Sequence, residues 1–409
     1  MNIKFSPPDI TEREIQEVAE ALRSGWITTG PRTKLLEKKI AAWVGVSCPE
    51  KGTPNCVCLN SQTACAEMAL RLLGIGPGDE VITSAYTYTA SASVIAHVGA
   101  TIVLVDTQKD SLEMDYDALS RAVTDKTKAI IPIDLGGVPC DYDKIFDIAE
   151  SKKSLFTPKT DMQKAIGRVA ILADTAHSFG AAYKGRKTGS LADFSSFSFH
   201  AVKNFTTAEG GALTWRTILG IDDSAIYKQA QLFSLHGQSK DALAKTQLGA
   251  WEYDIVGTWY KCNLTDVAAA IGLVQFERYP EMLAKRQAII EKYDAAFRPL
   301  GIKTLPHYTD SHTSSGHLYL TRIPGITQEE RNDIITKMAE RGVACNVHYK
   351  PLPMHTAYKN LGFDIKAYPN AYAQFANEIT LPLHTCLTEE EVDYVVEQFK
   401  DIVGGYIHV

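Results

Sequence analysis

The sequence predicts an α/β protein with a mostly parallel, seven-stranded large domain and a smaller α+β domain at the C-terminus. The chain of 409 residues is longer than one hydrophobic core usually organises. Before residue 255, short β-prone runs alternate with helical stretches, which is typical of a parallel sheet covered on both faces. Beyond that point long amphipathic helices dominate. We therefore expect a large domain over residues 1–255, including N-terminal helices, and a small domain over residues 256–409.

The N-terminal region is predicted to form two helices. Thr11 and Glu14 have the spacing of a capping box, and apolar residues follow them at helical spacing. A second amphipathic helix is predicted over residues 34–44. The loop between the helices, residues 25–32, contains an aromatic side chain, two hydroxyls and a proline. It either links the two helices or contacts a ligand, and its residues alone do not decide between these.

Seven strands are predicted in the large domain. Each is a short run rich in apolar or β-branched residues, and helical stretches separate most of the runs. Polar residues 150–167 interrupt this pattern, and we interpret them as a surface insertion. The predicted strands are residues 56–60, 80–83, 101–105, 128–133, 169–173, 194–199 and 211–215.

The small domain is predicted to begin with two successive helices. Thr265 caps the first, which runs to Tyr279, and a second apolar-periodic helix continues to about Phe297. A strand is expected to begin at His317. Two further capping boxes open helices at Thr327 and Thr388.

The composition argues against several classes of function. Forty-two basic and 48 acidic side chains give a net charge of −6, which indicates no basic surface for nucleic acid or an anionic membrane. No apolar run approaches the ~20 residues of a membrane span, and the first residues lack an apolar core of signal-peptide length. The eight cysteines form no CxxC pair and no metal-ligand spacing with histidine. We expect a cytoplasmic protein with reduced thiols and no metal site.

Two residues on successive strand ends suggest a covalent cofactor site. Lys203 lies in a loop of small and hydroxyl residues after the strand at 194–199, and Gly210 and Gly211 allow a close backbone approach. Asp174 ends a hydrophobic strand, where open α/β sheets bind ligands. Taken singly, the lysine is more often a surface residue and the aspartate a turn or cap residue. Together they can hold pyridoxal phosphate, the lysine as a Schiff base and the carboxylate beside the pyridine nitrogen.

Around these residues the sequence resembles the DegT-type nucleotide-sugar aminotransferases, which use pyridoxal phosphate. The motifs are Ala-Asp-Thr-Ala-His-Ser-Phe-Gly-Ala at 173–181, Ser-Phe-His-Ala-Val-Lys-Asn at 198–204 and Ala-Glu-Gly-Gly at 208–211. The resemblance covers nearly the whole chain and implies fold type I of pyridoxal-phosphate transferases, the aspartate-aminotransferase-like fold. It gives Lys203 and Asp174 the catalytic roles described above, and His177 matches a family histidine near the cofactor ring.

A strand-to-helix junction at residues 60–64 is the predicted phosphate site. Free amides and the positive dipole at a helix start suit a phosphate, and hydroxyls can supplement them. Ser61, Gln62 and Thr63 lie at this junction, although Ser61 can also be a simple N-cap. The family commonly has Ser-Gly-Thr here, so Gln62 raises the question of whether its backbone adopts a glycine-like conformation. Ser198 resembles the family's second phosphate contact.

Two tyrosines compete for the position over the cofactor ring. Tyr88 matches the family's stacking aromatic residue, and offset stacking contributes about 0.5–1.5 kcal/mol beyond burial. Tyr86 is its rival, because residues two apart on a strand share one face. Packing in the core is the ordinary role for either side chain.

The resemblance also implies contacts from other parts of the assembly. Asn263 resembles the asparagine that completes the phosphate site from the partner subunit, which implies a homodimer with shared active sites. An asparagine before a helix is also an ordinary cap. The candidates for contacting the nucleotide sugar are Thr28, Thr29, His348 and Lys350.

The predicted function is amination of a nucleotide-linked keto sugar by a two-half transamination, with glutamate as the expected amino donor. The motifs favour the branch that aminates carbon 4 of a UDP- or dTDP-linked 4-keto-6-deoxy sugar, in surface polysaccharide or glycan biosynthesis. A 3-keto-sugar aminotransferase and a non-catalytic, pyridoxal-phosphate-binding regulator are the alternatives. Lys203 argues against the sugar dehydratases of the family, which carry histidine at this position. No cysteine lies in a glycine-rich loop, as a cysteine desulfurase of this fold requires.

Overall fold

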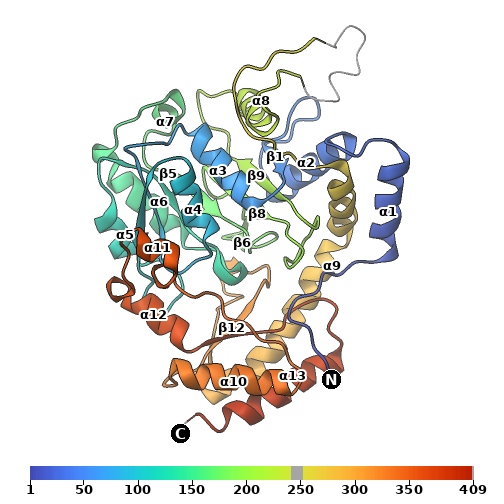
Figure 1. Cartoon of the computed structure of the whole chain (residues 1–409), viewed down its shortest axis with the longest axis vertical. Coiled ribbons are helices and arrows are strands. Elements are labelled where there is room, and N and C mark those ends of the chain that lie inside the picture. Colours follow the sequence, from blue (N-terminus) through green and yellow to red (C-terminus); the bar gives the residue numbers. More distant parts are fainter. Residues whose placement is uncertain (241–251, 408–409) are drawn as a thin grey trace.

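A seven-stranded sheet forms the centre of the computed structural model, which describes residues 1–240 and 252–407 (Figure 1). The strand order is β1-β9-β8-β5-β4-β2-β3; β9 runs antiparallel to both neighbours and the other pairs are parallel. All seven predicted strands are confirmed. Their bounds are β1 Cys56–Leu59, β2 Glu80–Ser84, β3 Thr101–Val105, β4 Thr127–Ile131, β5 Ala170–Asp174, β8 Phe194–Ser198 and β9 Gly211–Trp215.

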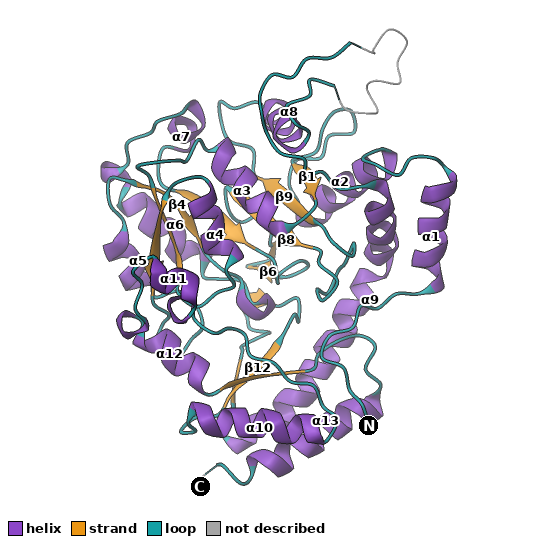
Figure 2. Cartoon of the chain, in the orientation of Figure 1, coloured by secondary structure: helices purple, strands orange, loops and turns teal. Residues whose placement is uncertain are grey.

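Helices cover both faces of this sheet, as the alternation of strands and helices predicts (Figure 2). Within β4, Ala129 and Ile131 pack into one hydrophobic core and Ile130 packs into another. Successive residues of a strand point to opposite faces, so these are the two sides of the sheet. The covering helices are α3 Gln62–Leu72, α4 Ala90–His97, α5 Tyr116–Ala122, α6 Tyr142–Ser151, α7 Asp161–Ile166 and α8 Asp223–Ser234.

The polar segment at residues 150–167 lies mostly at the surface. It contains a short 3₁₀ turn, Lys153–Leu155, and α7, which Thr160 caps through the amide of Gln163. Thr160 Oγ1 and Gln163 Nε2 both donate to the carbonyl of Leu73, at 3.1 and 2.9 Å. The segment is therefore anchored to the C-terminal end of α3, and its origin as an insertion stays a prediction.

The first helix confirms its predicted capping box, whereas the second begins earlier than predicted. In α1, Glu12–Arg23, Thr11 and Glu14 cap each other. The next helix, α2, covers Pro31–Val44 and so starts three residues before residue 34. Asp266, from the start of a distant helix, accepts the amides of Gly30, Arg32 and Thr33. This carboxylate caps α2 from elsewhere in the chain, and local sequence could not indicate it.

The region after residue 265 begins with one long helix rather than the two predicted. This helix, α9, runs unbroken over Asp266–Phe297 and contains Pro280. A proline inside a helix costs about 3 kcal/mol because it removes one hydrogen bond and crowds the preceding turn. Buried packing on both sides offsets that cost: Tyr279 and Met282 belong to the core shared with α2, and Ile289 and Ile290 belong to the C-terminal core.

A second, three-stranded sheet in the order β10-β12-β13 organises the C-terminal part. Its middle strand starts at Tyr319 and not at the predicted His317, because Leu318 has a φ of 77°, which extended backbone does not allow. Both predicted capping boxes, at Thr327 and Thr388, are confirmed. The bounds are β10 Lys303–Thr304, β12 Tyr319–Arg322, β13 Glu378–Leu381, α10 Gln328–Glu340, α11 Thr356–Asn360, α12 Pro369–Ala376 and α13 Glu389–Val403.

A small third sheet lies between these two parts. It joins the hairpin β6 Ala182–Tyr183 and β7 Arg186–Lys187 to β11 His312–Thr313. Because β11 comes from the C-terminal part and the hairpin from the large sheet's region, the two parts share backbone pairing. The domain boundary at residue 255 stays a prediction.

The N-terminal segment crosses from the C-terminal part to the loop that carries Lys203. Ile3 donates to the carbonyl of Gly342 and accepts from the amide of Ala344, at 2.7 and 3.0 Å. Ser6 Oγ then donates to the carbonyl of Val202 at 3.0 Å. No helix among the described residues is both long and apolar enough to cross a membrane, and the location of the protein in the cell stays a prediction.

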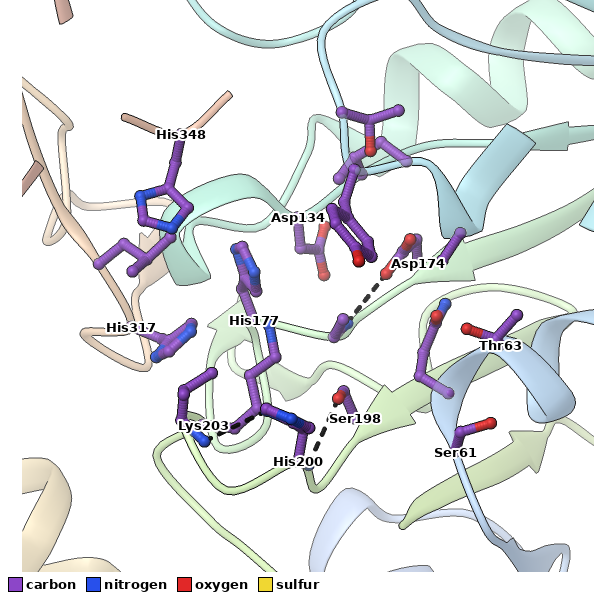
Figure 3. Close-up of a pocket in the computed structure, with 18 of the residues that line it drawn as sticks. Ser61, Thr63, Asp134, Asp174, His177, Ser198, His200, Lys203, His317 and His348 are labelled. Atoms are coloured by element: carbon purple, nitrogen blue, oxygen red, sulfur yellow. Dashed lines mark hydrogen bonds between the residues drawn. The ribbon is translucent and has the colours of Figure 1, made fainter. Parts of the chain in front are cut away.

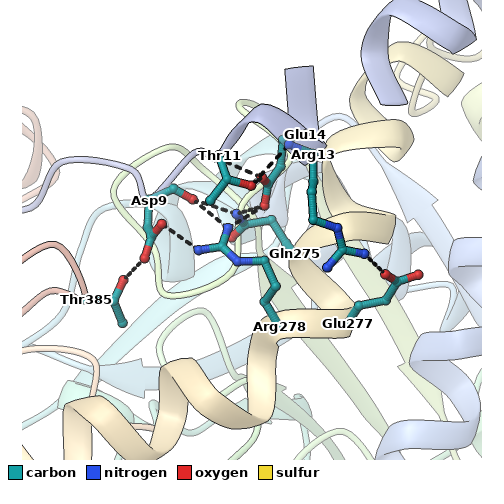
Figure 4. A network of polar contacts seen from close by, with 8 residues as sticks. All are labelled: Asp9, Thr11, Arg13, Glu14, Gln275, Glu277, Arg278 and Thr385. Atoms are coloured by element: carbon teal, nitrogen blue, oxygen red, sulfur yellow. Dashed lines mark hydrogen bonds and ion pairs between the residues drawn. The ribbon is translucent and has the colours of Figure 1, made fainter. Parts of the chain in front are cut away.

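A polar network fixes the end of this segment to α9 (Figure 4). The Arg278 guanidinium donates to Asp9 Oδ1 at 2.7 Å and to Glu14 Oε1 at 2.6 Å. Gln275 Nε2 donates to the same oxygen of Glu14, and Thr385 donates to the other oxygen of Asp9. The network therefore joins α1, α9 and the loop before α13.

Candidate active site

The candidate active site is a pocket of about 370 Å³ at the carboxyl ends of central strands of the large sheet. Its lining comes from the end of β5, the end of β8, the start of α3, the loop around Lys203 and two C-terminal segments around His317 and His348. Figure 3 shows these side chains converging from both parts of the chain. The pocket therefore lies where the carboxyl ends of parallel strands meet a helix start, as open α/β sheets place their ligands.

Asp174 ends β5 inside this pocket and is held by two donors. Its Oδ2 accepts from Ser91 Oγ at 2.6 Å, and its Oδ1 accepts from the amide of Ala176 at 3.1 Å. Burial raises the pKa of this carboxyl, while the two donors and the charge of Lys203 oppose the rise. A bound cation, such as a protonated ring nitrogen, is the partner that would favour its ionised form.

Lys203 faces the same pocket with no side-chain hydrogen bond among the described residues. Burial lowers the pKa of its amine to about 8, although the charge of Asp174 acts in the other direction. An ordinary lysine has a pKa of about 10.4, so at pH 7 about one Lys203 in ten is uncharged instead of fewer than one in a thousand. The side chain is thus prepared to act as a nucleophile and a base.

His177 connects Asp174's loop to the C-terminal part. Its Nδ1 accepts from the amide of Gly136 at 3.3 Å, so the proton lies on Nε2, which is 3.1 Å from the Tyr349 hydroxyl. Burial, followed by the charge of Lys203, lowers the pKa of this imidazole well below its usual range. His177 is therefore neutral and orients the Tyr349 hydroxyl in the pocket.

The start of α3, where the phosphate site is predicted, lies at the pocket. Ser61 is the N-cap of this helix, and Ser61, Gln62, Thr63 and Ser198 all line the pocket. Gln62 lies in ordinary helical backbone and donates to Ser196 Oγ at 3.0 Å, so no glycine-like conformation is needed there.

The close approach predicted at Gly211 is made to this same helix start. A Cβ at Gly211 would lie 2.6 Å from the amide nitrogen of Gln62. Glycine therefore lets β9 lie directly against the cradle, since any side chain would push α3 away.

The two tyrosines that were candidates for stacking on the cofactor ring lie in different environments. Tyr88 lines the pocket, is 61% exposed in this single chain and lies 5.9 Å from the Tyr349 ring. Tyr86 is only 1% exposed, and its hydroxyl donates to the carbonyl of His348 at 2.9 Å. Tyr86 is thus a core residue, whereas Tyr88 is free to stack on a ligand.

The remaining candidate residues lie in different environments. His348 lines the pocket, but the exposed Lys350 does not. Asn263 and Thr29 contact each other, Nδ2 to Oγ1 at 2.5 Å; neither lines this chain's pocket, although Asn263 pairs with Leu59 just before the α3 start, and the exposed Thr28 lies beside them. The structure therefore brings together Thr29 and Asn263 as a pair, separate from Lys203.

Several pocket residues were not predicted from the sequence. Asp134 lies shortly after the end of β4, and Asp174 lies at the end of β5, so the position of Asp134 near a strand end was a usable signal. Burial raises the pKa of Asp134 to about 7 despite donors from Ser178, Cys140 and Tyr142. Tyr349 and His317 had no such signal, because tertiary folding alone brings them to Lys203.

The donor set fits pyridoxal phosphate better than a metal ion. An amine nucleophile, a buried carboxylate and a helix start with hydroxyls match an aldehyde, a ring nitrogen and a phosphate respectively. The described residues include no group of three or more His, Cys, Asp or Glu side chains placed to hold a metal ion.

Comparison with known proteins agrees with this chemistry. Residues 8–400 match the model of the DegT/DnrJ/EryC1/StrS aminotransferase family. The spore coat polysaccharide biosynthesis protein SpsC of Bacillus subtilis is 36% identical, over 98% of this chain and 97% of SpsC.

Solved structures of similar proteins have the same fold. Spr1654 from Streptococcus pneumoniae, a protein assigned as a sugar aminotransferase, is 58% identical in its PMP form, with a TM-score of 0.95 over 99% of this chain and 100% of that one. Helicobacter pylori PseC, an aminotransferase involved in the biosynthesis of pseudoaminic acid, is 25% identical with a TM-score of 0.83, over 99% and 100% of the two chains.

Proposed function

This chain belongs to the DegT/DnrJ/EryC1/StrS aminotransferase family, and on that premise we propose that it aminates a keto sugar carried by a nucleotide. Its cofactor is pyridoxal 5'-phosphate, for which the PLP and PMP forms of the similar Spr1654 are the support. The observation that carries the proposal is the enclosure of Lys203, Asp174 and the α3 start in one pocket. When bound, the cofactor supplies an electron sink for breaking and forming bonds at a carbon that bears nitrogen.

Each residue of the pocket has a separate task. Lys203 Nζ holds the cofactor aldehyde covalently and, once released, moves the proton that transamination requires; positioned groups of this kind contribute roughly 10²–10⁴-fold. Asp174 would lie beside the ring nitrogen and favour its protonated form. Ser61, Thr63 and Ser198 hold the phosphate with the free amides of α3. Tyr88 would stack on the ring, and His177 orients the Tyr349 hydroxyl beside it.

The finer assignment is amination at carbon 4 of a UDP- or dTDP-linked 4-keto-6-deoxy sugar, with glutamate as the amino donor. Its support is the resemblance of the segments at 198–204 and 260–266 to that branch of the family. The polysaccharide role of SpsC and the sugar-acid role of PseC support a place in surface polysaccharide or glycan synthesis. We assign substrate contacts to His348, which lines the pocket, and to the exposed Lys350, which follows two residues later in the chain.

A homodimer with shared active sites is part of this proposal. Asn263 and Thr29 contact each other outside their own chain's pocket, as expected if they serve a partner's phosphate and nucleotide. Beside the Lys203 loop an apolar depression of about 320 Å³ lies between α1 and residues 201–208, and Ile15 there is 53% exposed. A second copy of this chain, covering that depression, is the occupant we propose.

Mass spectrometry of trial reactions tests the proposed function. Purified protein with pyridoxal phosphate and glutamate is incubated with UDP-, dTDP- and GDP-linked 4-keto sugars and, separately, with 3-keto sugars. We expect an amino-sugar product from a UDP- or dTDP-linked 4-keto sugar. A product only from 3-keto sugars would replace the assignment to carbon 4. A visible cofactor band that glutamate fails to bleach, with no product from any sugar, would favour the regulator.

A further inference from the structure

A buried glutamate beneath the pocket is hydrogen-bonded to a histidine of the pocket wall. Glu378 opens β13, is fully buried and does not line the pocket. Its Oε2 accepts the backbone amide of His348 at 2.8 Å, and its Oε1 accepts from Thr380 Oγ1 at 2.5 Å. Thr380 Oγ1 in turn lies 2.9 Å from His348 Nδ1. The three residues thus form a chain of hydrogen bonds that runs from the His348 amide through Glu378 and Thr380 to the His348 imidazole.

The Thr380 hydroxyl has one proton, and the acceptor to which it donates determines which nitrogen of the His348 ring is protonated. When Glu378 is ionised, its Oε1 can only accept, so Thr380 donates to it and must accept from His348 Nδ1–H. The imidazole is then protonated on Nδ1, and Nε2 carries a free lone pair. No protein group among the described residues bonds this Nε2, and Figure 3 shows the His348 ring on the pocket side beside His177.

We propose that Glu378 is a positioning residue that, when ionised, acts through Thr380 to make His348 Nε2 a hydrogen-bond acceptor for a hydroxyl of the bound sugar. The sugar in this inference rests on the function proposed above. The chain of bonds itself does not, because it exists in the protein without substrate.

Protonation of Glu378 reverses the chain. A proton on Oε1 would be donated to Thr380, Thr380 would donate to Nδ1, and the imidazole proton would move to Nε2, which then becomes a donor. Burial raises the pKa of Glu378 to about 8, and the donors Thr380 and His348 and the charges of Arg331 and Arg322 oppose the rise. The other titratable groups near Glu378 or His348 are Tyr86, Cys345, Tyr349, His177, His317 and Lys203.

The imidazole itself stays neutral throughout. Burial, followed by the charge of Lys203, lowers the pKa of His348 to about 3. The switch therefore exchanges one neutral tautomer for the other and adds no charge to the pocket. The acceptor form is favoured above the pKa of Glu378, and the donor form below it.

Glu378→Gln predicts one tautomer of His348, because the side-chain amide of the glutamine can bond both partners in only one orientation. The carbonyl oxygen has to accept the His348 amide, which leaves the NH₂ group to donate to Thr380. Thr380 then donates to Nδ1, and this variant is fixed in the Nε2–H tautomer. Thr380→Val breaks the chain with little change of shape, and Thr380→Ser restores the hydroxyl.

Nitrogen NMR of histidine-labelled holoenzyme measures the tautomer directly. The His348 signals are identified by their loss in His348→Gln. At pH 9 we expect Nδ1–H in the wild type and in Thr380→Ser, and Nε2–H in Glu378→Gln. The wild type should move toward Nε2–H as the pH falls through about 8, whereas Glu378→Gln, which keeps Lys203, should not change. The same tautomer in the wild type and Glu378→Gln at pH 9 would overturn the proposal. If Glu378→Gln does not fold, an Nδ1–H preference in Thr380→Val equal to that in Thr380→Ser would overturn it.

Kinetics test the role of the acceptor. With the nucleotide keto sugar at pH 9, where Glu378 is ionised, Thr380→Val should raise KM about two- to tenfold, the value of one neutral hydrogen bond, at similar kcat, and Thr380→Ser should restore it. A deoxy analogue lacking the bound hydroxyl should have the same KM in both variants. If Thr380→Val and Thr380→Ser have equal KM values for every sugar tested, His348 Nε2 does not accept from a sugar hydroxyl, and that part of the proposal is wrong. If no nucleotide sugar is aminated at all, the proposed function fails, while the NMR measurement still decides the role of Glu378.

Discussion

At the scale of single residues, Lys203 is the most direct test of the site. We expect Lys203→Ala to lose roughly 10²–10⁴-fold or more of the transamination rate, because this amine carries both covalent attachment and proton transfer. Its side chain makes no hydrogen bond among the described residues, so thermal unfolding should change little. The exposed Lys228 of α8 supplies the matched control. Full activity in Lys203→Ala would end the proposal.

The low pKa of Lys203 predicts how cofactor attachment depends on pH. Only the uncharged amine attacks an aldehyde, and it is the minor form below its pKa of about 8. The rate at which the cofactor-free protein takes up pyridoxal phosphate should therefore fall about tenfold per pH unit below 8 and level off above it. Visible absorbance after rapid mixing measures this rate. A break near pH 10 would mean that burial does not lower this pKa.

Asp174 acts on the cofactor rather than on its attachment. Asp174→Asn keeps the shape and the donor Ser91, so pyridoxal phosphate should still bind to Lys203. The neutral amide cannot stabilise a protonated ring nitrogen, and turnover should fall roughly 10²–10⁴-fold. Ser91→Ala leaves the charge in place and should cost less, about tenfold or below. Single-turnover rates with glutamate give the comparison, and near-wild-type turnover in Asp174→Asn would remove the aspartate from this role.

At the scale of helices, Arg278 of α9 holds the N-terminal segment and α1 against α9. Arg278→Met should lower the free energy of unfolding by about 1–3 kcal/mol, because the buried Glu14 and the neighbouring Asp9 lose a charged donor. Arg13→Met is the control: its ion pair with Glu277 is exposed, and its loss should cost less than about 1 kcal/mol. Urea unfolding of both variants measures the difference.

The dependence of unfolding stability on acid pH tests the same network. Burial acts to raise the pKa values of Asp9 and Glu14, but the donors Thr385, Thr11 and Arg278 outweigh it, so both pKa values are lowered. A lowered pKa stabilises the fold above the unfolded value and loses that contribution as the pH falls through the folded value. Arg278→Met should therefore lose less stability than the wild type between about pH 5 and pH 3. An equal loss of stability in both proteins would show that Arg278 does not contribute to the pH dependence of unfolding.

The helices also show what local sequence can determine. Capping boxes at Thr11, Thr327 and Thr388 were predictable because both partners lie within four residues. The start of α2 was not, since its cap Asp266 is 236 residues from Gly30. The helix that was predicted to end at Tyr279 continues through Pro280, because packing on both sides offsets the cost of the proline. Local rules therefore predicted the elements, and distant contacts decided their limits.

At the scale of the whole molecule, the same division applies to the pocket. Lys203, Asp174 and Ser61 were predictable because each stands in a strand-end motif whose chemistry is local. His317 and Tyr349 reach the pocket only when the C-terminal part packs against the large sheet. Asn263 shows the next limit, because its proposed role requires a second chain, which one sequence or one protomer does not contain.

Mixed dimers test that role of Asn263. Lys203→Ala and Asn263→Ala are each expected to be nearly inactive at limiting pyridoxal phosphate. If Asn263 serves the partner's site, a mixed dimer has one site with both residues intact. Random pairing makes half of the dimers mixed, so about a quarter of the wild-type activity should return.

The direction of this result is what distinguishes the two arrangements. If Asn263 served the site of its own chain, every site in a mixed dimer would lack either Lys203 or Asn263, and activity would stay at the level of the separate variants. Thr29→Val, which removes the hydroxyl partner of Asn263 but leaves the amide free, should complement Lys203→Ala in the same way if the pair acts as one unit. Light scattering of each mixture establishes that dimers are present, and a monomer with full activity would exclude shared sites.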